Sequence, residues 1–389
     1  MDKKKAQSAL ESVLYRVRKT NHELGGKFPY WADSNTGKWN TTEDGNWCAG
    51  HWITLLWLTA EYTDNIEEKA KLQVAAREYT HKMKQSMDKF KTSLFAGLNF
   101  NMAGFQGYDF SGDRELFGLG FTGADIVMNL YNEHSQQIAS GIYVIEGPQH
   151  ELTGDVSGKG WGWVTSGYET SAVDSAHAAI PVLLRAYKES GNLKFRDTAL
   201  SHLEIYLKRF IRDDGSTRQL VQFDPVTGKV IQEYKNLSSN VNGCWARGFG
   251  WCVSGLSEVW NNIPADRFLF ALESLAGYYT KNSNEDLVPC WDMSLKAESG
   301  EPRDTSCAVL VAYGLLKLEG DNDRIKKLRA LGESILDSLV DGYLVSEEDE
   351  KRGMLLHGCY SRPKQYAVDN ELIWSAYYLA FALDACLKK

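Results

Sequence analysis

Residues 305–318 read TSCAVLVAYGLLKL, residues 320–323 read GDND, and residues 325–339 read IKKLRALGESILDSL. The first stretch is apolar almost all the way round, which is typical of a helix that is buried on every side. The second stretch predicts a turn. The third carries its charges on one face, which is typical of an amphipathic helix at a surface. Together they predict a helical hairpin with one inner and one outer helix.

The same pattern recurs along the chain. Its first helices begin near His51, Asp174, Arg247 and Thr305, with a weaker copy near Glu115 and a last helix from Asn370 to the C-terminus. Six such helices, spaced by about 55–75 residues, predict six hairpins that close into a ring. We therefore predict an all-α (α/α)6 toroid that forms a single domain over residues 1–389. A short β-hairpin over 221–231 is expected at one end of the barrel.

The composition narrows the classes of ligand. Aromatic residues make up 12% of the chain, with 12 Trp and 19 Tyr. Such rings stack on the apolar faces of sugars, although a toroid core also uses many aromatics. The net charge is −8, and no basic run follows Lys3, Lys4 and Lys5. This balance argues against nucleic acid and anionic membranes as partners.

The remaining composition bears on location and cofactors. The chain has seven Cys, with no Cys-x-x-Cys pair, and eight His without helical i, i+4 pairing. Neither a disulfide framework nor a metal site is indicated, so we expect no cofactor and no metal. No apolar run is long enough for a membrane span or a secretory signal. These features predict a cytoplasmic protein. We expect it to be a monomer or a homodimer.

The starts of the inner helices are the expected place for chemistry. In a closed toroid they lie at one end, where free amides and helix dipoles favour an anion such as a uronic acid carboxylate. The polar and aromatic residues there are Asn46, Trp47, His51, Trp52, residues 113–115, Asp174, Trp245, Arg247, Arg303, Asp304, residues 369–371 and Trp374.

Asp174 is the first catalytic candidate. It opens a helix of small residues, and burial would raise its pKa towards the range useful for proton donation. The alternative is an N-cap, since Ser171-x-x-Asp174 resembles a capping box. Arg247 is the candidate anion clamp, because its planar fork pairs bidentately with a carboxylate. Its alternative role is an ion pair with an acidic neighbour.

Several rings are candidate sugar platforms. Trp47, Trp245, Trp251, Tyr360 and Trp374 could stack on a sugar or belong to the core. His357 could transfer a proton or be a hydrogen-bonded structural histidine.

From Lys27 to the C-terminus, the order and spacing of several short motifs carry a resemblance. These are Phe28-Pro29, Asn46-Trp47 with Trp52, Tyr62-Thr63, Val173-Asp174, residues 181–184, Phe223-Asp224-Pro225, residues 245–248, Trp291-Asp292, residues 303–306, residues 357–360 and Trp374. With them the chain resembles the unsaturated glucuronyl hydrolases, glycoside hydrolase family 88.

The resemblance implies an (α/α)6 catalytic domain in a cytoplasmic enzyme. Such enzymes remove the 4,5-unsaturated uronic acid that polysaccharide lyases leave at the ends of acidic oligosaccharides, by hydration of a vinyl ether. It implies that Asp174 is the proton donor and that Arg247 and Tyr360 contact substrate. Gln219 stands at a family histidine, and Glu146 at a family tryptophan before Gly147-Pro148.

One motif departs from the family. A second essential aspartate belongs to a His-Asp-x-Gly-Phe segment, and residues 101–105 read NMAGF here. Asn101 and Met102 cannot act as a base, so Glu146, Asp109 or Asp113 could take over. The leading hypothesis is a glycoside hydrolase with Asp174 and Glu146 as catalytic residues. The alternatives are a related lyase or epimerase that acts on a uronic acid, or a non-catalytic sugar-binding relative.

Overall fold

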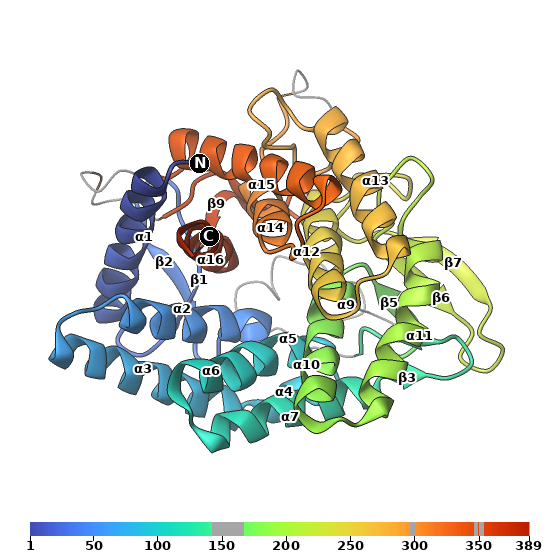
Figure 1. Cartoon of the computed structure of the whole chain (residues 1–389), viewed down its shortest axis with the longest axis horizontal. Helices are drawn as coiled ribbons and strands as arrows, with labels where there is room; N and C mark the ends of the chain where they lie inside the picture. The colour runs from blue at the N-terminus through green and yellow to red at the C-terminus, as the bar shows by residue number, and fades with distance from the viewer. Residues whose placement is uncertain (142–166, 296–299, 346–348, 350–353, 389) are drawn as a thin grey trace.

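In the computed structural model, six inner helices form a ring around the centre of the molecule (Figure 1). The structure describes residues 1–388 except 142–166, 296–299, 346–348 and 350–353. The inner elements are α2 (Ala49–Glu61), α5 (Phe95–Phe100) continued by η2 (Asn101–Gln106) and α6 (Gly107–Ser111), α9 (Ser175–Ala178) with α10 (Ile180–Ser190), α12 (Ala246–Asn262), α14 (Thr305–Leu316) and α16 (Ile373–Leu387). The predicted toroid is confirmed.

An outer helix covers each inner element. These are α3 (Ile66–Gln85), α7 (Arg114–Asn129), α11 (Leu193–Phe210), α13 (Asp266–Asn282), α15 (Asp323–Gly342) and α1 (Lys3–Glu23), and a short α4 (Met87–Phe90) follows α3. The first and last helices of the chain, α1 and α16, pack together and close the ring (Figure 1). All residues of α14 are buried, whereas α15 buries one face, as their sequences predict.

The second hairpin is placed differently from the prediction. Its inner element is the segment α5–η2–α6, and Glu115 lies in the first turn of the outer helix α7. The inner segment has a wide π-helical turn at its middle, which interrupts the regular spacing of apolar side chains. Its small residues allow close packing: a Cβ on Gly97 would lie 2.3 Å from the Ala178 carbonyl oxygen. The expectation that residues 113–115 start an inner helix was therefore wrong.

Short sheets lie beside the starts of the inner helices. One has the order β2 (Trp39–Thr42), β1 (Phe28–Ala32), β9 (Tyr366–Leu372), β8 (Gly358–Ser361), and another the order β5 (Thr170–Ala172), β6 (Leu220–Phe223), β7 (Val230–Tyr234). A two-stranded ribbon joins β3 (Tyr131–Asn132) and β4 (Gln137–Ile138). Strands β6 and β7 form the predicted hairpin. Because β9 leads into α16 and β5 leads towards α9, these sheets position the helix starts.

Candidate active site

Asp174 lies between β5 and α9, at the end of the ring where the inner helices begin. Its side chain is 5% exposed, and its Oδ2 has no hydrogen-bond partner in the described structure. Asp174 stands at the N-cap position of α9, but its carboxyl makes no capping bond to that helix, so a capping role for the side chain is not supported. Burial raises the pKa of Asp174 to about 6, although the charge of Arg247 lowers it. A carboxyl with this pKa can give up a proton near neutral pH.

Arg247 lies in the first turn of α12 and is 2% exposed. Its two terminal nitrogens donate to the backbone carbonyls of Cys359 and Tyr360, at 2.8 and 2.9 Å. The guanidinium carbon lies 4.7 Å from the ring centroid of Trp245 and 5.3 Å from that of Trp374. No described carboxylate forms a salt bridge with it, so the ion-pair alternative is not supported. A guanidinium has five donors, and these two bonds leave others for a ligand.

Asp304 is a second buried carboxyl in this region, and the sequence alone did not single it out as a catalytic candidate. Its Oδ1 accepts from the backbone amides of Ser306, at 3.0 Å, and Cys359, at 3.2 Å, so it ties the start of α14 to β8. Its Oδ2 has no partner among the described residues. Burial raises the pKa of Asp304, and the charge of Arg247 lowers it. The sequence does contain a feature that could have identified Asp304, because this aspartate comes directly before a wholly apolar helix.

Trp47 belongs to an aromatic cluster around these groups. Its Nε1 donates to the hydroxyls of Tyr30 and Tyr360, at 3.0 Å each. The Trp47 ring lies 4.7 Å from Trp374 and 6.3 Å from Trp251, centroid to centroid. Each of the five residues just named is at most 5% exposed: Trp47, Tyr30, Tyr360, Trp374 and Trp251. Four of the predicted platforms, Trp47, Trp251, Tyr360 and Trp374, therefore pack against one another, which fixes their orientation. The fifth, Trp245, lies against the guanidinium of Arg247.

Gln219 and His357 hold loops beside the cluster. The Oε1 of Gln219 accepts from the backbone amides of Asn236 and Leu237, at 2.8 Å each, and its buried Nε2 has no partner in the described chain. The Gln219 carbonyl also accepts from the amide of Val173, next to Asp174. His357 pairs through Nδ1 with the carboxylate of Asp369 and is 45% exposed, so it has a structural contact in the β8–β9 hairpin.

Met102 occupies the place expected for a second aspartate. It lies in η2, is 2% exposed, and packs against the start of α2, where a Cβ on Gly50 would lie 2.8 Å from the Met102 Cβ. This apolar packing offers no base. Glu146 lies outside the described residues.

Asp109 and Asp113, the predicted alternatives to Glu146, lie at the other end of the inner segment. Asp109, on α6, accepts from both terminal nitrogens of Arg185, at 2.6 and 2.8 Å. Asp113 caps α7 by accepting from the amide of Glu115. Neither carboxylate belongs to the Asp174 region, because an antiparallel outer helix begins where its inner partner ends.

Comparisons with known proteins identify the relatives of this chain. The family described as Glycosyl Hydrolase Family 88 matches residues 32–386. An unsaturated chondroitin disaccharide hydrolase of Streptococcus agalactiae is 24% identical over 388 residues, covering 98% of this chain and 92% of that protein. An unsaturated glucuronyl hydrolase of Bacillus sp. (strain GL1) is 24% identical over 386 residues, which cover 97% of this chain and 95% of that protein.

Solved structures share the fold. The unsaturated glucuronyl hydrolase of Streptococcus agalactiae superposes with a TM-score of 0.85 at 22% identity, over 100% of this chain and 93% of that one. The enzyme of Bacillus sp. GL1 superposes with a TM-score of 0.84 at 22% identity, over 97% of this chain and 96% of that one.

Proposed function

Because this chain belongs to glycoside hydrolase family 88, we propose that it removes a 4,5-unsaturated uronic acid from the non-reducing end of oligosaccharides that polysaccharide lyases produce. The observation that carries the proposal is the buried carboxyl of Asp174, whose free Oδ2 and pKa of about 6 suit a proton donor beside the cation of Arg247. Relatives named for unsaturated chondroitin disaccharides and glucuronyl groups support an acidic oligosaccharide as substrate.

The reaction consumes one water molecule. Protonated Asp174 gives its proton to C4 of the C4=C5 bond, and the positive charge that develops at C5 is shared with the ring oxygen. Water adds to C5 and loses a proton, which produces a hemiketal. The C5–O5 bond then breaks, the ring opens, and the hemiacetal left at C1 releases the remaining saccharide as an alcohol.

The described residues supply the other roles. Arg247 binds the uronic acid carboxylate with donors that its bonds to Cys359 and Tyr360 leave free, and those bonds hold its plane. The sugar ring packs against the aromatic side chains of Trp47, Trp245, Trp251 and Tyr360. For Gln219, the unpartnered Nε2 supports a hydrogen bond to a sugar oxygen.

The water-activating group is proposed to be Glu146, which the resemblance places at a substrate contact. His357 completes the proposed contacts from the β8–β9 side. The apolar packing of Met102, where the family has an aspartate, is the observation that favours the rival functions, a uronic acid lyase or epimerase or a non-catalytic sugar-binding protein.

The seven cysteines are all free thiols, and six of them are buried. This supports the proposal of a reducing cytoplasm, where thiols persist. Among the described helices, none has the length and apolar character of a bilayer span. We propose that the whole chain is one catalytic domain that works as a monomer or homodimer.

A spectroscopic screen tests the function. Unsaturated disaccharides made by lyases from several glycosaminoglycans and plant polymers absorb through the C=C bond. A hydrolase makes this absorbance fall with time, and Asp174→Asn should stop the fall. Absorbance that rises on intact polymer would instead identify a lyase, and a flat trace with bound sugar would identify a binding protein.

A further inference from the structure

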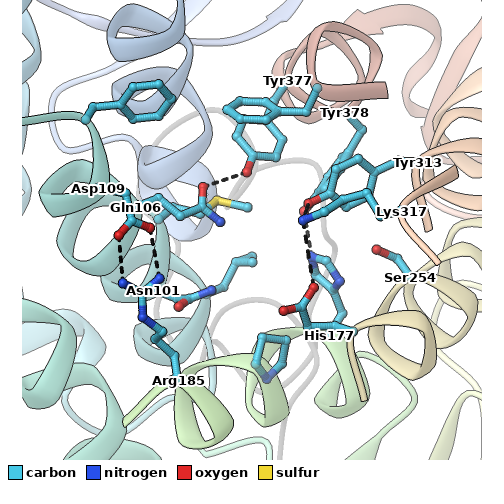
Figure 2. Close-up of a pocket in the computed structure, with 16 residues that line it drawn as sticks. Asn101, Gln106, Asp109, His177, Arg185, Ser254, Tyr313, Lys317, Tyr377 and Tyr378 are labelled. Carbon is cyan, nitrogen blue, oxygen red and sulfur yellow. Dashed lines mark hydrogen bonds and ion pairs between the residues drawn. The ribbon is translucent and has the colours of Figure 1, made fainter. Parts of the chain in front are cut away.

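A cavity of about 280 Å³ is lined by side chains of the inner helices. Its lining includes Asp109, Glu258 and Lys317 at the ends of inner helices, and Arg185 and Phe381 from the middle of α10 and α16. Figure 2 shows side chains from α5–α6, α10, α12, α14 and α16 pointing into the same space. The cavity therefore lies in the lumen of the barrel. Its lining contains neither Asp174 nor Arg247, although Met102, which stands where the family has its second aspartate, borders it.

A polar layer forms the floor of this cavity. Tyr378 Oη lies 2.6 Å from Nε2 of His177 and 3.3 Å from Nε2 of His51. The rings of His177 and Trp251 lie 4.8 Å apart. Trp251 in turn contacts Trp47 of the active-site cluster. The layer therefore lies between the cavity and the aromatic cluster around Trp47.

The hydrogen bonds of this layer fix where its protons lie. Burial lowers the pKa of both histidines to about 3, so both rings are neutral. The Nδ1 of His51 faces the Cys48 carbonyl at 3.2 Å and must be the donor, so its Nε2 accepts from Tyr378. His177 Nε2 must then donate to Tyr378, which leaves its Nδ1 as an acceptor. That Nδ1 has no partner in the described structure.

The cavity lining combines unused polar atoms with aromatic rings. Ser254 is 2% exposed, and its Oγ has no partner among the described residues. Figure 2 shows this hydroxyl directed at the cavity. Tyr313, Tyr377 and Phe381 present rings to the same space. Hydroxyl groups matched by polar side chains, with aromatic rings beside them, are the features that recognise a sugar.

The charges of the lining cancel. Arg185 is paired with Asp109, and Lys317 lies 3.8 Å from Glu258 and donates to Tyr313 at 3.1 Å. Unlike the Arg247 region, this cavity has no excess positive charge for a carboxylate. Its volume is slightly below the usual range for ligand pockets, ~300–1,000 Å³, so it suits one ring rather than two.

We propose that this cavity binds one neutral monosaccharide, a hexose or N-acetylhexosamine, through Ser254, His177 and the surrounding tyrosines. The lining of this site contains neither Asp174 nor Arg247, and its occupancy does not depend on the reaction at Asp174.

Ligand-observed NMR on the full chain tests the proposal, with glucose, galactose, N-acetylglucosamine and N-acetylgalactosamine as probes and glucuronate as the charged competitor. At least one neutral probe should bind with a Kd of roughly 1 mM or tighter. Glucuronate should not displace it. Ser254→Val removes the hydroxyl and should weaken binding roughly three- to tenfold, the typical worth of a hydrogen bond. The matched control Ser257→Val removes a hydroxyl on the same helix that bonds the Val253 carbonyl, and binding should not change.

Lys317→Met at the rim provides a second variant in case Ser254→Val does not fold, and it should also weaken binding. Neither variant should reduce hydrolysis of unsaturated disaccharides. The proposal is overturned if no neutral probe binds, which would mean that the cavity holds only water. It is equally overturned if glucuronate displaces the probe, or if binding is lost with Arg247→Met and unchanged with Ser254→Val and Lys317→Met.

Discussion

The guanidinium of Arg247 acts on the carboxyl of Asp174 through its charge: it lowers a pKa that burial has raised to about 6. Both groups lie at the starts of inner helices, because α9 begins at Ser175 and α12 begins at Ala246, 71 residues later. The balance between burial and this cation sets the pH range in which Asp174 can donate a proton.

Asp174→Asn should lower turnover at least about 100-fold, because the amide keeps the size of the side chain and has no acidic proton to give. Turnover is measured as loss of C=C absorbance with an unsaturated disaccharide. Circular dichroism should show an unchanged helical spectrum. A folded Asp174→Asn protein with wild-type turnover would exclude Asp174 as the acid.

The pH profile of the rate should depend on Arg247. A general acid works in its protonated form, so the wild-type rate should fall as pH rises through about 6. Arg247→Met removes the charge that lowers this pKa, so the fall should move to higher pH. Arg247→Lys keeps the charge and should leave the fall near its wild-type position while weakening affinity for acidic substrates, since the bidentate fork is lost. Equal weakening towards a methyl-esterified substrate would indicate that Arg247 only holds the Cys359–Tyr360 backbone.

Paired kinetics of Glu146→Gln and Met102→Asp test the second catalytic group. If Glu146 activates water, Glu146→Gln should lose turnover by at least about tenfold and change the pH profile. Met102→Asp should then increase turnover only slightly, because a base is already present. Wild-type turnover in Glu146→Gln, together with hydrolysis that appears only in Met102→Asp, would favour the rival functions.

The close contact between α9 and α12 should be sensitive to a single methyl group. A Cβ on Gly255 would lie 2.4 Å from the backbone of Ala176. Gly255→Ala should therefore destabilise the protein by about 1–3 kcal/mol and disturb the positions of Asp174 and Arg247. Gly277→Ala is the control, because nothing lies within 4 Å of its Cβ and alanine favours a helix. Thermal unfolding should show a lower Tm for the first variant and an equal or higher Tm for the second.

Glu371 should make stability depend on pH. It is 1% exposed, and burial raises its pKa to about 8, although Arg16 lowers it. The folded state then binds a proton that the unfolded state loses above its ordinary pKa, so stability falls as pH rises from about 4.5 to about 8. Glu371→Gln should raise Tm more at pH 9 than at pH 5. The exposed Glu67→Gln should show no such difference, and equal shifts at both pH values for Glu371→Gln would contradict the prediction.

The sequence by itself determined the class of fold and the first catalytic candidate. Apolar residues all round 305–316 and one-sided charges over 323–342 specify an inner and an outer helix, because burial of a helix face is a local property of its periodicity. Asp174 could be found in the same way, as a carboxyl at the start of a buried helix. The second hairpin could not, because the π-helical turn at 101–106 interrupts that periodicity.

Only the tertiary structure decided which groups meet. It showed that the Asp174 carboxyl makes no capping bond, that Arg247 bonds to backbone carbonyls over 100 residues away along the chain, and that Asp304 joins α14 to β8. It also brought Ser254 and His177 to one cavity in the lumen of the barrel. These contacts join residues that are distant in the chain, so they depend on how six hairpins close into a ring, and no local pattern of residues records that closure.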